Sequence, residues 1–544
     1  MNREHMTLYP SLLADCFEKV RRNFYEKIDE KKHARVYEGI FPEGYAEPEF
    51  TGKFLDLCAY YYESEGDTRA LEKGMEVIRS IQKNIRADGY LGCHEPGKER
   101  AAFSFWNHGF TLYGITRMYE ATGDPAILSL VRRAADFVEE TYRDPAAPDI
   151  LEASNKGSQN ISCLYAMGRA YLATGERRYL DFIGRVLAYC ERTDMPLLSF
   201  GSIFDLRSQK GIEMLVVYLG VLQYGLLAGD RTACDAARRY MDEVLAGQVR
   251  NTGGGTLREA WTVGGNAPRL MPTEEKPNET CVAVGIVELA LALFCVYQKP
   301  AYLDAAERSL FNHMAGSLEK SGADLAYYQG NFGRKIYRTD DGAYQCCRYR
   351  GFTLFSYLKE YAYTWADGCL YPTVYLPGEY EKDGIRVRLE TDYPTGDTLA
   401  FTVKNTAAPF LLKLRIPAWC KEFSLEGASY EMTEDGFCTL SVGVGELAFV
   451  LRFVTEVRVD VCEIEGRPYL SATYGAMLLA HDTRFGGDIA DALDPAAPVT
   501  PAEKTADAHL HFTMDGRHLV DFASAGAHDP ENDRYTVFVP VKTN

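Results

Sequence analysis

The chain has 544 residues, of which 46% are hydrophobic and 25% charged, a composition typical of a folded globular protein. Its formal net charge is −18 and no basic run occurs, which argues against nucleic acid as a partner. The N-terminus lacks a signal-peptide pattern, and Glu288 interrupts the longest apolar segment, so we predict no membrane span. We expect a cytoplasmic protein with reduced cysteines, with a homodimer left open.

Between about residues 10 and 320, the sequence repeats a pattern of two helices joined by a turn. The turn glycines Gly66, Gly123, Gly175 and Gly229 recur about every 55 residues, the length of two helices with their loops. Such hairpins can stack into an open superhelix or close into a ring. We predict an (α/α)6 toroid over residues 1–365, with a superhelical repeat protein as the alternative.

After Tyr363 the apolar period changes to two, as in IRVRLETDY and FLLKLRIPAW. Short strands separated by turns predict an antiparallel β-sandwich over residues 366–460. Residues 461–544 are less regular, and we expect them either to complete the sandwich or to form a second small β domain. The predicted fold class is therefore multidomain α + β, with the toroid first and the sandwich after it.

Two short cysteine motifs, ETC and QCC, stand out as candidate metal ligands. ETC begins a long apolar run that predicts a buried helix, whereas QCC lies in a polar stretch. Three thiols and one carboxylate are a ligand set of tetrahedral zinc, although four protein ligands also suit a purely structural ion. The candidate zinc ligands are Glu279, Cys281, Cys346 and Cys347.

A set of motifs spread over most of the chain carries a family resemblance. They are DGYLGC, MYEATGD, AYLATGERRYLDF, ETCVAVG, QCC, TDYPTGD and LKLRIPAW. In this combination the sequence resembles glycoside hydrolase family 127, the zinc- and cysteine-dependent glycosidases best known as β-L-arabinofuranosidases. The resemblance implies a retaining exo-glycosidase that releases a terminal β-L-arabinofuranoside or related sugar from a small oligosaccharide or glycoside.

The resemblance also assigns roles to the cysteine motifs. It places the family's zinc ligands on Glu279, Cys281, Cys346 and Cys347, and the nucleophile on Cys346. Zinc lowers the pKa of a thiol, and the thiolate is the nucleophilic form. Attack on the anomeric carbon would give a thioglycosyl intermediate, which water then hydrolyses with retention of configuration.

The family's general acid/base is a glutamate that follows a TGG turn. Here Glu259, in the sequence REAW, matches this motif, but its spacing to Glu279 is longer than in the family. Glu274 and Glu275 are rival candidates, because they stand closer to Glu279. Beside Lys276 in a proline-flanked turn, they are also typical of a solvated loop.

The sequence departs from the family where the sugar is held. Positions of the family's pocket histidines fall near Phe110, Asn160 and Lys210, and only His108 could supply an imidazole close by. The residues chosen for sugar binding are His108, Asn160 and Lys210, with Trp106 and Tyr328 as aromatic surfaces for stacking.

Two arginines replace the family's PPN after the vicinal cysteines. Arg348 and Arg350, with Lys210 across the pocket, could pair with a carboxylate and favour an acidic sugar. Equally, the arginines could pair with Asp340 and Asp341 and hold the loop.

Two other classes of function remain open from the sequence. One is a lyase or epimerase on the same toroid, acting on acidic sugars with a Tyr or His base. The other is a non-catalytic, zinc-stabilised carbohydrate-binding protein. Alanine at Cys346 would leave the activity of a lyase or epimerase in place.

Overall fold

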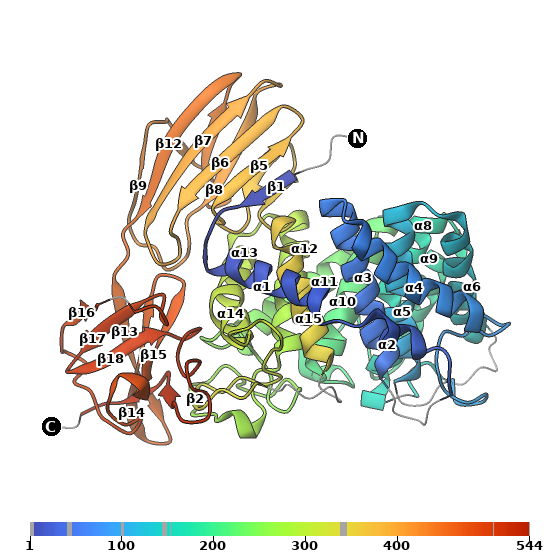
Figure 1. Cartoon of the computed structure of the whole chain (residues 1–544), viewed down its shortest axis with the longest axis horizontal. Coiled ribbons are helices and arrows are strands. Elements are labelled where there is room, and N and C mark those ends of the chain that lie inside the picture. Colours follow the sequence, from blue (N-terminus) through green and yellow to red (C-terminus); the bar gives the residue numbers. More distant parts are fainter. Residues whose placement is uncertain are drawn as a thin grey trace.

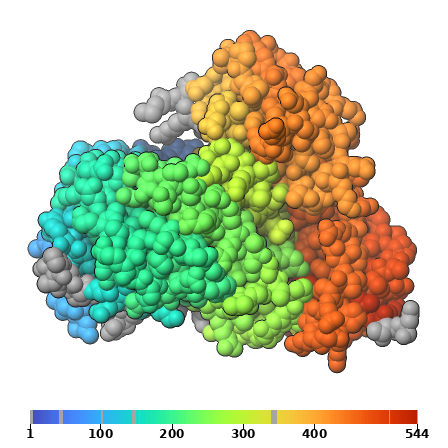
Figure 2. Space-filling model, turned by 180° about the vertical axis from the view of Figure 1, so that it is seen from behind, coloured from blue at the N-terminus to red at the C-terminus, as the bar shows by residue number. Residues whose placement is uncertain are grey.

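A computed structural model of the chain describes residues 5–40, 46–99, 103–143, 149–152, 154–337, 345–503 and 505–542. Figure 1 shows a helical part, a β-sandwich beside one end of it, and a further β domain that carries the C-terminus. Figure 2 shows the same three lobes from behind. The predicted multidomain α + β class is confirmed.

Six inner helices form a closed ring. Each packs against the next, and the last packs against the first, which distinguishes a toroid from an open superhelix. They are α3 (Glu47–Glu65), α5 (Ser104–Thr122), α8 (Cys163–Thr174), α10 (Gly211–Ala228), α12 (Thr280–Tyr297) and α15 (Gln345–Ser356). The predicted (α/α)6 toroid is thereby confirmed.

An outer helix covers each inner helix. The outer helices are α1 (Leu12–Glu26), α4 (Thr68–Asn84), α6 (Pro125–Thr141), α9 (Arg177–Cys190), α11 (Arg231–Gly247) and α13 (Pro300–Arg308). In α4 the buried positions Ala70, Val77, Ile78 and Ile81 recur at helical spacing, because only one face meets the inner ring. The shorter helices are α2 (Glu30–Arg35), α7 (Ser158–Ile161) and α14 (Ala315–Ser317).

The inner helices are apolar on nearly all sides, since other helices surround them. By length and composition, α10 and α12 could each cross a membrane, but 67% and 72% of their apolar windows are buried inside the protein. Four inner helices, α3, α5, α8 and α10, end at the repeating glycines, all of which have a left-handed backbone. This conformation is open to glycine without steric cost, so it explains the repeat in the sequence.

The β-sandwich has two sheets with a shared core. The first has the order β1 (His5–Leu8), β5 (Gly378–Lys382), β6 (Ile385–Thr391), β7 (Thr398–Asn405), β12 (Gly445–Phe453) and β9 (Phe423–Glu426). The second has the order β10 (Glu431–Met432), β11 (Phe437–Val442), β8 (Phe410–Arg415), β4 (Cys369–Pro372) and β3 (Tyr363–Ala366). All pairings are antiparallel except that of β4 with β8. The N-terminal strand β1 therefore belongs to the sandwich, although the helical part follows it (Figure 1).

The strands after about residue 457 form a sheet of their own. Its order is β13 (Val457–Ile464), β14 (Arg467–Tyr474), β15 (Met477–Asp482), β18 (Arg517–Asp521), β17 (His511–Met514) and β16 (Val499–Pro501), with β2 (Phe332–Gly333), β19 (Tyr535–Thr536) and β20 (Val539–Pro540) at its side. It has separate hydrophobic clusters. The strands from residue 457 on thus pair in a sheet separate from the two sheets of the sandwich.

Candidate active site

The predicted site residues gather where the inner helices begin. Glu279 is the residue before α12, Lys210 is the residue before α10, and Cys346 and Cys347 lie in the first turn of α15. Glu49 lies in the first turn of α3. Helix N-termini carry a partial positive charge, which favours carboxylates and thiolates at this end of the ring.

Three of the four predicted metal ligands form a compact buried cluster. The ligand atoms of Glu279, Cys281 and Cys347 all lie within 4.8 Å of one another. Ligands of one tetrahedral zinc lie roughly 4 Å apart, so these donors are within reach of one ion. Glu279 Oε2 is buried and has no hydrogen-bond partner among the described residues. A cation coordinated by this oxygen would satisfy it. The cluster can therefore bind a metal.

The fourth predicted ligand, Cys346, lies beside this cluster. Its Sγ is 3.2 Å from Cys281 Sγ and 3.1 Å from Glu49 Oε1. Lys53 Nζ lies 3.5 Å from the same sulfur. Cys346 thus stands between the metal-binding cluster and a buried pair of charged residues.

That buried pair, Glu49 and Lys53, is absent from the prediction. Glu49 and Lys53 are one turn apart on α3, only 2% and 3% exposed, and form an ion pair. Burial, together with the nearby Cys346, raises the pKa of Glu49 to about 8. A signal existed in the sequence, since EFTGKFLDL places two charges four residues apart within an apolar helix.

The three thiols differ in acidity. Burial alone would raise the pKa of Cys281, but hydrogen bonds from Cys346 and Cys347 and the charge of Lys53 outweigh it and lower this pKa to about 6. Burial raises the pKa of Cys347 well above its usual value. Cys281 is therefore the thiol that ionises near neutral pH, and its thiolate accepts hydrogen bonds from the neighbouring cysteines. Metal binding requires such a deprotonated ligand.

Glu259 lies in a cavity of about 480 Å³ that Arg258, Glu274, Lys276 and Tyr328 also line. One carboxylate oxygen accepts hydrogen bonds from the Tyr327 hydroxyl, at 2.9 Å, and from the Tyr328 hydroxyl. The other oxygen pairs with Lys210. Burial would raise the pKa of Glu259, but Lys210 and the two tyrosines keep it below the usual value. The side chain is therefore a carboxylate in the free protein.

The backbone around Glu259 is strained. Five non-glycine residues there have a left-handed φ: Thr256, Arg258, Glu259, Lys276 and Asn278, with values from 49° to 69°. Such residues are uncommon and cluster at functional sites, where the surrounding structure holds them. Isolated β-bridges join Ala260 of this loop to Lys210, and Glu279 to Tyr328.

The rival acids Glu274 and Glu275 pair with arginines outside the contacts of Glu259. Glu275 forms an exposed ion pair with Arg269 at 2.9 Å, and Glu274 lies 3.5 Å from Arg334. Glu274 lines the same cavity but is exposed. Glu259 is therefore the better placed candidate for the general acid/base.

Two sugar-binding predictions need correction. His108 is fully buried: Nδ1 accepts from the Leu91 amide at 3.2 Å, and Nε2 lies 2.9 Å from the Ala134 carbonyl, toward outer helix α6. Asn160 donates to the Ile150 carbonyl at 3.0 Å and to Tyr142, so it holds a loop. Helical packing turns both side chains to protein partners, and neither is a substrate-binding candidate.

Two of the predicted cations also have protein partners. Lys210 pairs with Glu259, and Arg350 pairs with buried Glu288. Asp340 and Asp341, the alternative partners of the arginines, lie outside the described residues. Arg348 is half-buried and packs over the Phe352 ring at 5.8 Å.

Of the aromatic predictions, Tyr328 lies in the cavity with Glu259. Trp106 is buried and packs edge-on against Phe110, whose ring is 4.7 Å from Lys53 Nζ. Trp106 is thus connected to Cys346 through two intervening side chains.

Comparisons with known proteins agree with this arrangement. A family model described as the β-L-arabinofuranosidase GH127 catalytic domain matches residues 3–360, and the GH127 middle-domain model matches residues 370–444. None of the curated proteins compared with the chain matches it in sequence. The chain is therefore a glycoside hydrolase. It belongs to the GH127 β-L-arabinofuranosidase family.

Solved structures show the same fold over the full length. A GH127 β-L-arabinofuranosidase from Geobacillus stearothermophilus superposes with a TM-score of 0.78 at 16% identity, covering 99% of this chain and 100% of that one. A second structure, titled a GH127 β-arabinofuranosidase, has a TM-score of 0.81 at 17% identity, with coverage of 99% and 96%.

Proposed function

We propose that the protein is a retaining exo-glycosidase that hydrolyses a terminal β-L-arabinofuranoside, with Cys346 as nucleophile and Glu259 as general acid/base. The observation that carries the proposal is the position of Cys346. Its sulfur contacts Cys281, Glu49 and Lys53 at the end of the ring where the metal-binding cluster lies.

The residues divide the reaction into two steps. In the first, Cys346 Sγ forms a bond to the anomeric carbon while the bond to the leaving oxygen breaks, and Glu259 donates a proton to that oxygen. In the second, Glu259 removes a proton from water, whose oxygen bonds to the anomeric carbon as the bond to sulfur breaks. Two displacements at one carbon give net retention.

The cysteines and Glu279 would hold a zinc ion, since three sulfurs and a carboxylate are a zinc donor set. When bound, zinc would keep the thiols deprotonated and fix their directions. Lys53 acts in the same sense, because a cation near Cys346 Sγ stabilises the negative charge on sulfur.

Glu259 must gain a proton before it can act as an acid. Lys210 opposes this in the free protein, because the ion pair favours the carboxylate. The proposal therefore requires Lys210 to leave Glu259 when the sugar enters, and to bind a sugar hydroxyl instead. A neutral sugar has hydroxyl groups that can accept this hydrogen bond from Lys210.

The internal pairing of cations favours a neutral sugar over an acidic one. Lys210 must leave Glu259 for either kind of sugar, but a substrate carboxylate that bound Arg350 would also have to displace Glu288 from it. We propose a short, neutral arabinofuranosyl oligosaccharide that the cell takes up, consistent with a cytoplasmic protein.

Release of 4-nitrophenol from aryl β-L-arabinofuranosides and uronides tests the proposal, with zinc content measured on the same samples. Wild type should prefer the arabinofuranoside, and Cys346→Ala should lower kcat/KM by about 10³ or more. The matched control is Cys295→Ala, which removes an exposed thiol near the other end of the ring and should leave activity unchanged. Bound zinc without turnover of any glycoside would instead indicate a structural metal.

A further inference from the structure

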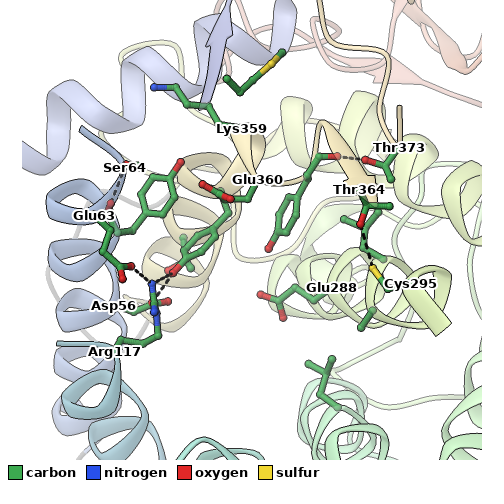
Figure 3. Close-up of a pocket in the computed structure, with 18 of the residues that line it drawn as sticks. Asp56, Glu63, Ser64, Arg117, Glu288, Cys295, Lys359, Glu360, Thr364 and Thr373 are labelled. Atoms are coloured by element: carbon green, nitrogen blue, oxygen red, sulfur yellow. Dashed lines mark hydrogen bonds and ion pairs between the residues drawn. The ribbon is translucent and has the colours of Figure 1, made fainter. Parts of the chain in front are cut away.

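A second cavity lies at the opposite end of the toroid. It has a volume of about 930 Å³, and all six inner helices contribute residues to its lining. Strands β1 and β3 of the sandwich close one side. Figure 3 shows labelled residues of this lining, among them Asp56, Glu63, Arg117 and Glu288, which come from three of the inner helices. Ligand pockets span roughly 300 to 1,000 Å³, so this cavity is large enough for a small ligand.

The second cavity is separate from the candidate active site. A small pocket of about 30 Å³, lined by Trp106, Phe110, Tyr113 and Tyr165 among others, adjoins the second cavity, with which it shares Tyr113 and Tyr165. The second cavity and the cavity around Glu259 have no described lining residue in common.

The charges that line the second cavity are already neutralised within the protein. Arg117 contacts Asp56 at 3.1 Å and Glu63 at 2.6 Å (Figure 3). Arg350 pairs with Glu288. A charged ligand would have to compete with these buried ion pairs, at considerable cost. The lining therefore selects against both anions and cations.

Tyrosine side chains form much of the uncharged lining of the second cavity. The rings of Tyr60 and Tyr357 have centroids 4.4 Å apart, and Tyr361 stacks beyond Tyr357 at 6.2 Å. The hydroxyls of Tyr60 and Tyr363 are buried and have no hydrogen-bond partner among the described residues. Burial raises the pKa of Tyr60 and Tyr363, so both hydroxyls stay protonated and can donate. Aromatic faces with neutral hydroxyls suit a sugar.

We propose that this second cavity binds a neutral mono- or disaccharide at a site distinct from the candidate active site. The proposal rests on the cavity's volume, its internally paired charges and its tyrosines with unsatisfied buried hydroxyls. It is independent of the reaction proposed for Cys346.

Calorimetric titration with L-arabinose, D-xylose and cellobiose tests this site. The blocking variant is Ala292→Trp, because Ala292 lines the cavity on α12 and a larger side chain would fill it. The control is Leu226→Trp, which adds the same side chain at an exposed position of α10. Ala292→Trp should weaken binding of at least one sugar tenfold or more, whereas Leu226→Trp and Glu259→Gln should leave that binding unchanged.

A milder variant covers the case in which Ala292→Trp fails to fold. Tyr60→Phe removes one hydroxyl that lacks a partner, so it should fold normally and still weaken sugar binding. Binding that is lost in Glu259→Gln but kept in Tyr60→Phe and Ala292→Trp would overturn the proposal, as would no heat of binding for all three sugars. Hydrolysis, assayed separately, should remain in both cavity variants.

Discussion

The two ends of the helical ring use the same six helices in opposite ways. At the N-terminal ends, Glu49, Glu279 and the cysteines place acidic groups where the helix dipole is positive. Toward the C-terminal ends, Arg117 of α5 and Arg169 of α8 both pair with Glu120 instead. The metal-binding cluster lies at the N-terminal ends.

The ends differ in which buried groups lack a partner among the described residues. Near Cys346, a buried carboxylate oxygen of Glu279 lacks one, and the loop around Glu259 has a left-handed backbone. At the other end, Arg117 contacts three carboxylates, and the neutral hydroxyls of Tyr60 and Tyr363 lack a partner. An unpartnered carboxylate oxygen beside thiols, together with a strained loop, distinguishes the end that is suited to chemistry.

The largest expected effect is at the metal-binding end. Cys281→Ala removes one ligand of the cluster, so zinc should be lost and kcat/KM should fall by about 10³. Elemental analysis and hydrolysis of an aryl arabinofuranoside measure both. Cys163→Ala, a buried thiol on α8, is the control and should retain metal and activity. Full zinc content in Cys281→Ala would contradict the ligand assignment.

Substitutions at the opposite end of the ring should lower the stability of the protein and leave its catalytic activity unchanged. Arg117→Met leaves buried Asp56 without its cation, at a cost of about 3–5 kcal/mol in the free energy of unfolding. Urea denaturation measures the loss, and hydrolysis by the folded variant should be unchanged. Arg177→Met breaks an exposed ion pair with Asp181 and should leave the free energy of unfolding nearly unchanged. Equal losses in the two variants would contradict this account.

Glu213, on the first turn of α10, should make stability depend on pH. Burial raises its pKa from 4.5 to about 7, so the folded state binds a proton that the unfolded state has lost. Its folded-state pKa is raised, so stability should fall as pH rises from about 4.5 to 7, by up to about 3 kcal/mol. Thermal unfolding between pH 4.5 and 8 should show this fall in wild type and a flatter profile in Glu213→Gln. Identical profiles would exclude Glu213 as the source.

The smallest expected effect concerns Lys210. Lys210→Met removes the cation that lowers the pKa of Glu259, so that pKa should rise. The basic limb of the pH profile of kcat/KM should then move to higher pH, with about a tenfold loss at the optimum. Lys276→Met removes another cation from the same cavity and is the control. A basic limb that stays in place would show that Glu259 is not the acid.

Much of the fold could be predicted because it depends on local signals. Helical spacing, left-handed glycine turns and the change to period two gave the ring and the sandwich. The separate sheet after about residue 457 could not be assigned, because strand pairing between distant segments leaves no local trace. The same holds for β1, which pairs with β5 across the whole helical part.

The candidate site could be predicted only in part. The ETC and QCC motifs pointed to the cluster, since they combine rare ligands next to a buried helix. The protein partners of His108 and Asn160 could not be foreseen, because sequence position does not fix which way a helical side chain points. Glu49 and Lys53 were missed because their significance depends on Cys346, 297 residues away from Glu49.

The amino-acid sequence by itself determined which segments are helices or strands, and which few residues have side chains that could bind a metal. Local backbone preference and the intrinsic chemistry of thiols and carboxylates are sufficient for both. Only the tertiary structure decided which residues share an end of the ring. Closure of the six helices into a ring brings Glu49, Glu279 and Cys346 together and pairs Lys210 with Glu259. It also creates the second cavity. Each of these features depends on packing between segments that lie far apart in the chain.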